Sequence, residues 1–232
     1  MKAWKAILIV TSLGALGFGA FKLWETKAES KPKAKRKRKK RAKQFTASIS
    51  PLPDSLKAQM RGVSWHEGCP VPLEDLSLVK VRYRNYQGAN ATGRLIIASD
   101  VAQSLVDAFR DLYQSGFPIE KMQPVYKFGG SDAESMRANN TSAFNCRKST
   151  GSSKWSEHSK GTAIDINPVV NPYVSSGGSV QPIEGAKYAD RSIVVKGTIT
   201  PEIAAIFDRH GWKWGGDWRS TKDYQHFSRS GR

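Results

Sequence analysis

The sequence predicts an α+β fold in which a small antiparallel sheet is flanked by helices. Apolar and polar residues alternate over residues 76–84, which indicates a half-buried strand, and apolar residues recur with helical spacing over residues 101–112. Further strand-like and helix-like segments mix without a regular alternation of the two. The 232 residues are 39% hydrophobic and 10% aromatic, which is enough for a full-sized core and excludes a chain that is disordered throughout.

The folded part is expected to begin near Pro53, with a short helix over residues 54–61. Two strands follow, the alternating segment at 76–84 and an apolar segment at 95–98. Residues 122–128 predict a further strand.

A longer helix is predicted between the second and third of these strands. Ser99 or Asp100 supplies a polar N-cap, the helix runs to about Gln114, and Gly116 ends it. Its inward-facing apolar residues are expected to be Val101, Leu105, Phe109 and Leu112.

The rest of the domain is less regular. Residues 129–147 are polar and rich in Asn and Ser, which is typical of loops that form a functional site. Residues 161–166 and 224–228 predict strands, and residues 201–210 predict a helix followed by Gly211.

Positive charge is concentrated at the N-terminus. Residues 1–44 hold 14 of the 37 Lys and Arg residues and 2 of the 20 Asp and Glu residues, which leaves 23 basic and 18 acidic residues for the remainder. The formal charge of +17 therefore describes the N-terminal segment more than the predicted domain.

An uncharged segment, residues 6–21, follows two lysines. This is the arrangement of a secretory signal peptide, and residues 22–24 would extend it toward the roughly 20 residues of a membrane anchor. We assign residues 1–24 to a signal peptide or membrane anchor and leave the two open. The domain is then expected in the cell envelope, at its periplasmic or extracellular face.

Residues 25–52 are interpreted as a polybasic linker, because ten of the thirteen residues at 31–43 are basic. Such a run binds phospholipid head groups, anionic cell-wall polymer or nucleic acid. Because the run lies beside an apolar segment, we favour contact of residues 1–43 with the membrane or another anionic envelope surface over contact with nucleic acid. The positive-inside rule instead prefers such a run in the cytoplasm, so the orientation stays open.

The two cysteines, Cys69 and Cys146, exclude a disulfide-rich scaffold and an all-cysteine zinc site. In an exported domain they would pair and brace Arg147, whereas two buried free thiols are the alternative.

The first group of candidate metal ligands lies in the segment SEHSKGTAIDI, residues 156–166. His158 precedes a predicted strand by one turn, and Gly161 allows close backbone packing, so that His158 and Asp165 can converge. Asp165 lies between two residues expected to face the core, where a carboxylate is costly unless it binds a cation.

The second group is Asp223 and His226, near the C-terminus. Residues three apart in a strand face opposite sides, so the two share a site only if Asp223 lies in a turn or bulge. Two histidines and one carboxylate leave the fourth position of a tetrahedral zinc open, as in catalytic sites, and a further carboxylate can serve as general base. Taken alone, a single histidine is more often a structural residue, and an aspartate near glycine usually marks a turn.

The pattern S-x-H-x-x-G-x-A-x-D, followed about sixty residues later by D-x-x-H-F, resembles the M15 family of zinc peptidases. The resemblance covers roughly residues 60–229 and implies a Hedgehog/DD-peptidase-like zinc fold for a domain at 53–232. The endopeptidase-like branch is indicated by further matches at residues 140–147, 165–168, 171–173 and 211–216.

The resemblance implies a role for each site residue. Asp223 takes the position of the general base, Arg147 that of the arginine which holds the substrate carbonyl and its developing oxyanion, and Ser156 belongs to the substrate-binding wall. Ser228 departs from the family, because many relatives have an acidic residue there. The implied Zn²⁺ ligands are His158, Asp165 and His226.

The resemblance implies a zinc metallopeptidase that acts on peptidoglycan stem peptides or muropeptides. Cleavage of the L-Ala–D-Glu bond is our first choice, and D-Ala–D-Ala carboxypeptidase activity is the alternative. A catalytically silent, zinc-stabilised cell-wall-binding module is a further alternative, although every ligand, base and arginine position is filled. A nucleic-acid-binding protein would rest on residues 31–43 alone. The oligomeric state is not predicted.

Other polar and aromatic residues are interpreted as structural. His66 and His210 lack a partner motif, and His210 is favourable at a helix C-terminus. Glu157 is expected to face solvent. Three tryptophans are expected in the core and the cleft wall: Trp212, Trp214 and Trp218.

Overall fold

The computed structural model describes residues 44–149 and 151–232. The predicted signal peptide or anchor and the polybasic run at 31–43 lie outside the described residues. Among the residues that are described, no helix has the length and apolar character needed to cross a membrane.

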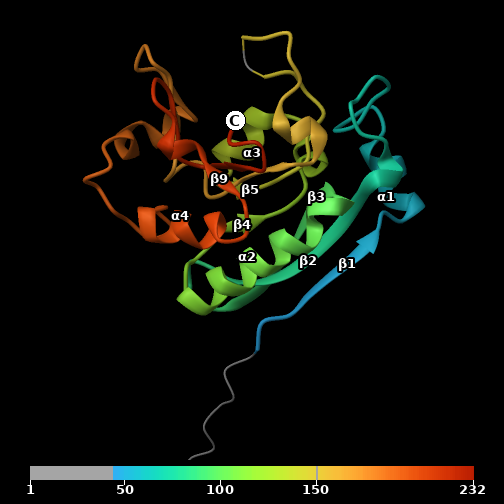
Figure 1. Cartoon of the computed structure of the whole chain (residues 1–232), viewed down its shortest axis with the longest axis horizontal. Coiled ribbons are helices and arrows are strands. Elements are labelled where there is room, and N and C mark those ends of the chain that lie inside the picture. Colours follow the sequence, from blue (N-terminus) through green and yellow to red (C-terminus); the bar gives the residue numbers. More distant parts are fainter. Residues whose placement is uncertain (1–43, 150) are drawn as a thin grey trace, which may run out of the picture. The chain divides into compact units, whose positions relative to one another are not determined.

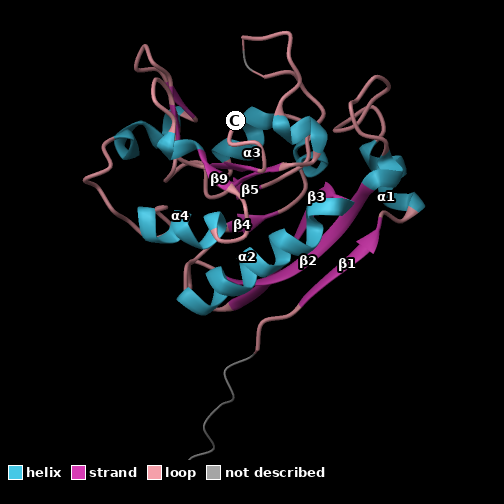
Figure 2. Cartoon of the chain, viewed as in Figure 1, coloured by secondary structure: helices cyan, strands magenta, loops and turns pink. Residues whose placement is uncertain are grey.

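The described chain mixes short helices with small sheets (Figures 1 and 2). The α-helices are α1 (Asp54–Met60), α2 (Ala102–Ser115), α3 (Asp132–Arg137) and α4 (Pro201–Asp208). The strands are β1 (Ala47–Pro51), β2 (Leu76–Arg84), β3 (Asn90–Ala98), β4 (Lys121–Met122), β5 (Asn140–Thr141), β6 (Ala163–Asp165), β7 (Tyr173–Val174), β8 (Val180–Gln181), β9 (Lys213–Trp214), β10 (Lys222–Asp223) and β11 (His226–Ser228). The predicted α+β class with small antiparallel sheets is confirmed.

The largest sheet is an antiparallel meander in the order β1-β2-β3. Helix α2 lies along one face of it (Figure 1) and covers Val79, Val81 and Leu95. Leu78 and Ile96 face the other way, into a second apolar cluster with α1. Strand β2 is therefore buried on both faces over its first half, whereas its alternating sequence predicted a half-buried strand.

The main core connects this sheet to the strands that carry the polar site. Phe109 of α2 packs edge-on against Phe207 of α4, with ring centroids 6.0 Å apart. Phe207 in turn stacks on Phe227 of β11 at 4.3 Å. Because His226 precedes Phe227 in the same strand, the packing of one large side chain in the core fixes the histidine at the surface of that core.

Three further small sheets surround the site: β6-β11-β9, β10-β7-β8 and the parallel pair β4-β5. In the first of these, β6 and β11 are antiparallel and their register places Asp165 directly opposite His226. Side chains in such a pair lie close together on one face of the sheet, which brings two residues that are far apart in sequence into contact.

Three segments differ from the sequence prediction. Residues 47–51 were assigned to the linker, but β1 pairs with β2 along its whole length, so the fold extends beyond the boundary predicted at Pro53. The strand predicted at 122–128 is wrong: only β4 is extended, and Val125–Phe128 form a 3-10 turn after Pro124, whose missing N–H and fixed φ interrupt a ladder.

The third difference lies in residues 129–147, predicted to be irregular, which contain α3 and β5. The Ser131 hydroxyl caps α3 by accepting a hydrogen bond from the Glu134 amide at 3.2 Å, a capping-box spacing that the sequence displays.

Gly161 illustrates how backbone geometry positions the site. It has φ of 68°, and a Cβ built on it would lie 2.6 Å from the Ala98 nitrogen. Its carbonyl accepts a hydrogen bond from that same nitrogen at 2.9 Å. Glycine is thus required both for the left-handed conformation and for the close approach to β3.

Gly161→Ala is therefore expected to lower the free energy of unfolding by about 2 kcal/mol or more, from φ strain plus the backbone clash. Gly116→Ala is the matched control, because Gly116 has φ of 80° but no atom within 4 Å of the added Cβ. Urea unfolding should give the larger loss for Gly161→Ala; equal losses in the two variants would contradict the role of the close approach.

Candidate metal centre

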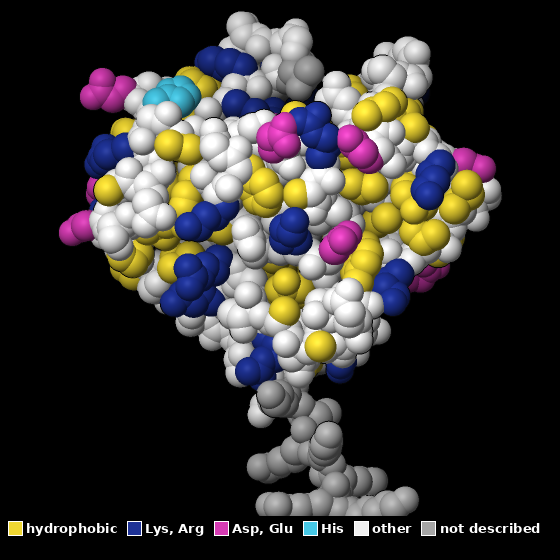
Figure 3. Space-filling view, turned by 180° about the vertical axis from the view of Figure 1, so that it is seen from behind, with side chains coloured by type: hydrophobic (Ala, Val, Ile, Leu, Met, Phe, Trp, Pro, Cys, Tyr) yellow, Lys and Arg dark blue, Asp and Glu magenta, His cyan; other side chains and the backbone are white. Residues whose placement is uncertain are grey.

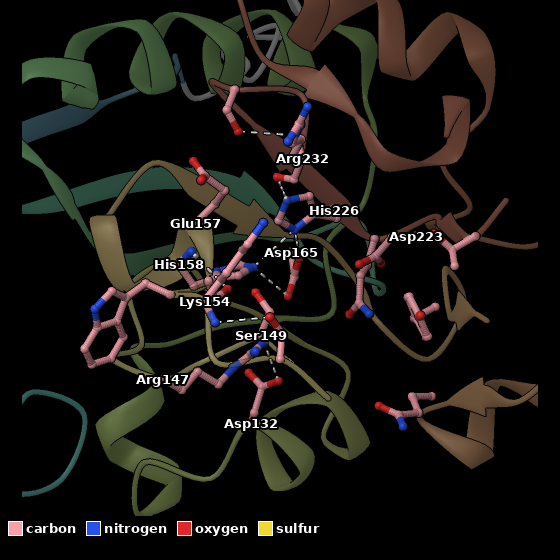
Figure 4. Close-up of a pocket in the computed structure, with 18 of the residues that line it drawn as sticks. Asp132, Arg147, Ser149, Lys154, Glu157, His158, Asp165, Asp223, His226 and Arg232 are labelled. Atoms are coloured by element: carbon pink, nitrogen blue, oxygen red, sulfur yellow. Dashed lines mark hydrogen bonds and ion pairs between the residues drawn. The ribbon is translucent and has the colours of Figure 1, made fainter. Parts of the chain in front are cut away.

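Two histidines and an aspartate meet in a buried cluster (Figure 4). His158 Nε2 lies 3.2 Å from Asp165 Oδ2, and His226 Nδ1 lies 3.1 Å from Asp165 Oδ1. The two facing histidine nitrogens are 3.2 Å apart. All three residues are at most 6% exposed. The structure thus brings together the three residues that the sequence analysis proposed as ligands.

Each of the three comes from a different element. His158 lies in the 3-10 turn η4 (Glu157–Lys160), whose N-cap Ser156 accepts a hydrogen bond from the His158 amide at 3.3 Å. Gly161 ends that turn, and the chain then enters β6, which carries Asp165. Strand β11 supplies His226 across the antiparallel pair.

Backbone carbonyls fix the orientation of both imidazole rings. His158 donates from Nδ1 to the Ala143 carbonyl at 2.6 Å, and His226 donates from Nε2 to the Arg232 carbonyl at 3.0 Å. These bonds leave the lone pairs of His158 Nε2 and His226 Nδ1 directed at each other and at Asp165. Three electron-pair donors that face one point in a buried site repel one another unless a cation lies between them.

The electrostatics of the cluster also favour a positive charge between these donors, a proton or a metal ion. Burial acts to raise the pKa of Asp165, but the charges and hydrogen bonds of His158 and His226 outweigh it and hold that pKa well below its usual range. Burial acts to lower the pKa of His226, and the hydrogen bond and charge of Asp165 instead raise it to about 9. Two imidazole nitrogens and a carboxylate are a donor set that suits Zn²⁺, so the residues present fit that ion.

Asp223 lines the same cavity as His158, Asp165 and His226 but belongs to a different sheet. It lies in β10, and a turn at residues 224–225 separates it from β11, which meets the condition for Asp223 and His226 to share a site. A Cβ on Gly215 would lie 2.6 Å from the Asp223 carbonyl oxygen, so this glycine allows the close approach. Burial raises the pKa of Asp223 to about 6, with a contribution from the nearby Asp165 charge. Its Oδ1 is buried without a hydrogen-bond partner among the described residues.

Arg147 is held in the cleft by contacts at both ends. Its amide donates to Ser159 Oγ at 2.9 Å, and its Nη2 forms an ion pair with Asp132 Oδ2 at 2.7 Å. The arginine Nε is buried and has no partner among the described residues. Sequence reasoning missed Asp132, although the capping-box spacing after Ser131 was a signal that would have placed it in the first turn of a helix.

The cysteine pair left open by the sequence is a disulfide in the structure. Cys69 and Cys146 are bonded, with Cα atoms 6.0 Å apart and a sequence separation of 77. His66 donates from Nε2 to the Cys146 carbonyl at 3.1 Å. This histidine therefore has a structural contact away from the cluster of His158, Asp165 and His226, which we call the metal cluster. Both interactions fix the backbone immediately before Arg147.

Reduction of this disulfide is expected to lower the free energy of unfolding by about 4 kcal/mol, because it releases a loop of this length in the unfolded chain. Urea unfolding with and without reductant measures the effect. Cys69→Ser should unfold at the midpoint of the reduced protein and be insensitive to reductant; coincident curves for the oxidised and reduced wild-type protein would contradict the prediction.

The metal cluster opens into a cleft of about 950 Å³. The residues that line it include Asp132, Arg147, Ser156, His158, Asp165, Asp223 and His226. Trp218 forms part of its wall, with its ring 5.5 Å from that of His226, and Trp212 is fully buried in the core. Both placements agree with the interpretation of these tryptophans as cleft wall and core.

One expectation needs correction. Glu157 was expected to face solvent, but it lines the cleft and pairs with Lys160 at 2.6 Å, because turn η4 directs it back over the strand that follows. The hydroxyl of Ser228, the residue that departs from the family pattern, accepts a hydrogen bond from the Gly231 amide at 3.1 Å and forms no hydrogen bond with His226. The Arg232 carbonyl holds His226 instead. His210 pairs with Asp111 at 3.0 Å, away from the metal cluster.

Residues 150–229 match the family model of D-alanyl-D-alanine carboxypeptidases within the M15 peptidases. The match includes the three candidate ligands, Asp223 and Ser156, and it begins after Arg147. Neither curated proteins nor solved structures give a match to this chain. The resemblance to M15 peptidases is thereby confirmed for this segment, and it supports a hydrolase that acts on peptide bonds.

Proposed function

We propose that this chain, as a peptidase of the M15 family, is a zinc-dependent hydrolase of peptidoglycan stem peptides. The observation that carries the proposal is the buried cluster of His158, Asp165 and His226, whose lone pairs converge at the edge of a large cleft. Asp223 lines the same cleft with one carboxylate oxygen unpartnered among the described residues. A metal site with a free carboxylate beside it is the arrangement of a hydrolase.

His158, Asp165 and His226 would hold the zinc ion. When bound, zinc would supply Lewis-acid chemistry, polarising the scissile carbonyl and a water molecule. Asp223 would accept the proton of the attacking water and later deliver it to the leaving amine. Burial, which raises the pKa of Asp223 in the metal-free chain, suits this role because it favours the protonated form that the base must reach during the reaction.

Arg147 would stabilise the negative charge that develops on the carbonyl oxygen. A positive charge held in place is effective there because it needs no reorganisation during the reaction. The ion pair with Asp132 limits the movement of the guanidinium, and the bond from the Arg147 amide to Ser159 fixes the backbone that carries it. Both contacts favour such preorganisation.

Two bonds of the stem peptide are candidates. The motif matches at residues 140–147, 165–168, 171–173 and 211–216 support L-Ala–D-Glu endopeptidase activity, which is our first choice. The description of the matched family supports D-Ala–D-Ala carboxypeptidase activity as the alternative. Both reactions use the same chemistry at the metal and differ only in which part of the peptide occupies the cleft.

Mass spectrometry of muropeptides incubated with the full-length, zinc-loaded chain tests the proposal. Products that begin at D-Glu would support the endopeptidase, and loss of one terminal D-Ala would support the carboxypeptidase. A folded, zinc-loaded protein that releases neither product would refute a hydrolase of stem peptides and favour a zinc-stabilised wall-binding module.

We further propose that the domain acts in the cell envelope, where its substrate lies. The signal-like segment at 1–24 and the Cys69–Cys146 disulfide support this, because disulfides persist in oxidising compartments. On the face of the described domain in Figure 3, basic side chains are dispersed among apolar and acidic ones, so this face lacks the continuous basic patch typical of nucleic-acid binding. Recovery of the chain from the cytoplasmic fraction of its cells would refute the envelope assignment.

A further inference from the structure

Half of the acidic and basic side chains that line the cleft are paired with one another. Four acidic and four Lys or Arg side chains line it. Arg147 pairs with Asp132 at 2.7 Å, and Lys160 pairs with Glu157 at 2.6 Å. Asp165 lies between the two histidines, and Asp223 is the proposed base. A divalent cation added to this balanced set leaves the cleft with a net charge of about +2, which favours an anionic substrate.

Two cations of the lining, Lys154 and Arg232, have no acidic partner among the described residues. Lys154 lies on the same wall as Arg147 and Ser156. Arg232 lies at the opposite side of the metal cluster, where its carbonyl is already bonded to His226.

The backbone of Lys154 is fixed by local contacts. Its amide donates to Ser152 Oγ at 3.1 Å, and its carbonyl accepts from the Ser149 amide at 2.9 Å. The neighbouring Lys148 and Trp155 form an antiparallel bridge, and the Lys148 ammonium lies 3.3 Å from the centre of the Trp155 ring. One lysine of this wall is thus bound to an aromatic ring, whereas the side chain of Lys154 extends into the cleft on the side of the metal cluster (Figure 4).

We propose that Lys154 binds a carboxylate of the substrate next to the cleaved bond. This inference rests on the proposed function and narrows its substrate class. Both candidate bonds offer such a group on the residue that leaves with the amine. It is the terminal carboxylate after a D-Ala–D-Ala bond, or the free α-carboxylate of a D-Glu that continues the chain through its γ-carboxyl. The two sources share one chemistry, an anion at a fixed short distance from the scissile carbonyl.

Two pairs of synthetic peptides test the assignment. In each pair, one member carries the carboxylate and the other a carboxamide at that position, after an L-Ala–D-Glu bond in the first pair and after a D-Ala–D-Ala bond in the second. The full-length, zinc-loaded chain should prefer the carboxylate in one pair by about 10-fold or more in kcat/KM, as expected for a charge-assisted hydrogen bond. The pair in which the preference occurs identifies the source of the carboxylate.

Lys154→Met should reduce this ratio to near one by slowing the carboxylate peptide and leaving the carboxamide peptide almost unchanged. Lys160→Met is the matched control, since it removes the same charge from the same cleft but from a lysine already held by Glu157. An equal fall of the ratio in both variants would overturn the assignment in favour of a general positive field. A ratio kept in Lys154→Met and lost in Arg232→Met would overturn it in favour of Arg232.

Isothermal titration separates this inference from the proposed hydrolysis. The same four peptides are titrated into the zinc-loaded wild-type chain and Lys154→Met, so that the carboxylate preference is measured as an affinity ratio without turnover. Absence of hydrolysis together with a Lys154-dependent preference would refute the proposed reaction and support the carboxylate site. Equal affinities of the wild-type chain for both members of each pair would overturn the Lys154 assignment whether or not the peptides are cleaved.

Discussion

Asp223→Asn is expected to lower kcat for muropeptide hydrolysis by about 100-fold or more and to leave zinc bound. The magnitude is the usual contribution of a positioned general base, and Asn retains the shape of Asp but accepts no proton at neutral pH. Asp223 is not one of the three convergent donors, so the zinc content after dialysis should equal that of the wild-type chain. Steady-state kinetics and metal analysis on the same preparation measure both quantities.

Glu157→Gln is the matched control for this substitution. Glu157 is another carboxylate in the same cleft and is adjacent in sequence to a ligand, but its charge is already engaged by Lys160 and Thr162. It should retain most of the activity. A larger loss in Glu157→Gln than in Asp223→Asn would reverse the roles of the two carboxylates and refute the assignment of Asp223 as the base.

Asp223→Asn also has a predicted effect on the stability of the metal-free protein. Burial raises the pKa of Asp223 from its usual value to about 6, so the folded state holds this proton more tightly than the unfolded state. The contribution of the protonated Asp223 carboxyl to stability is therefore fully present below the unfolded pKa, and it is lost as the pH rises from that value through about 6. Asp223→Asn lacks this titration and should gain up to a few kcal/mol over the wild-type chain above pH 6 and nothing near pH 3.

Urea unfolding of both metal-free proteins across this pH range measures the difference. A gain that is independent of pH would contradict the burial of an ionised Asp223 carboxylate as its cause. A stabilising substitution that abolishes turnover is the pattern expected of a residue kept for function at the expense of stability.

The candidate ligands could be predicted from the sequence better than the contacts around them, because two of the ligands lie close together in the chain. His158 and Asp165 belong to one local turn and strand, so their convergence follows from a short segment with Gly161 in it. The partnership of Asp165 with His226 depends on the register of β6 against β11, which hydrophobic spacing does not encode. Only the family resemblance predicted that His226 and His158 belong to one site.

Contacts made by single polar residues from distant segments could not be predicted. Asp132 reaches Arg147 because α3 packs beside the loop that follows β5, and neither segment carries a periodic pattern that announces this. Strand β1 was missed because its sequence, ASISP, is weakly apolar and mostly exposed. Its position is determined by the hydrogen-bonding edge of β2, which is a tertiary effect.

Replacement of a single ligand should have the largest effect of all, and His158→Ala is the most informative choice. It removes one of the three donors and leaves the Asp165–His226 contact at 3.1 Å in place, so the core beneath the site is retained. Loss of an outer contact to a metal ligand already costs about 10- to 100-fold in affinity, so loss of the ligand itself should weaken zinc binding by more than about 100-fold. Hydrolysis should fall to background at zinc concentrations that saturate the wild-type chain.

Thermal unfolding distinguishes loss of metal from loss of fold. A bound ion stabilises the folded state by an amount that grows with the logarithm of its concentration relative to its Kd. A chelator should therefore lower the Tm of the wild-type chain and leave that of His158→Ala unchanged. His210→Ala serves as the control, because His210 pairs with Asp111 outside the cluster and its variant should keep both the chelator response and activity. A chelator that lowers the Tm of wild type and His158→Ala equally would show that the stabilising ion binds elsewhere, and it would refute His158 as a ligand.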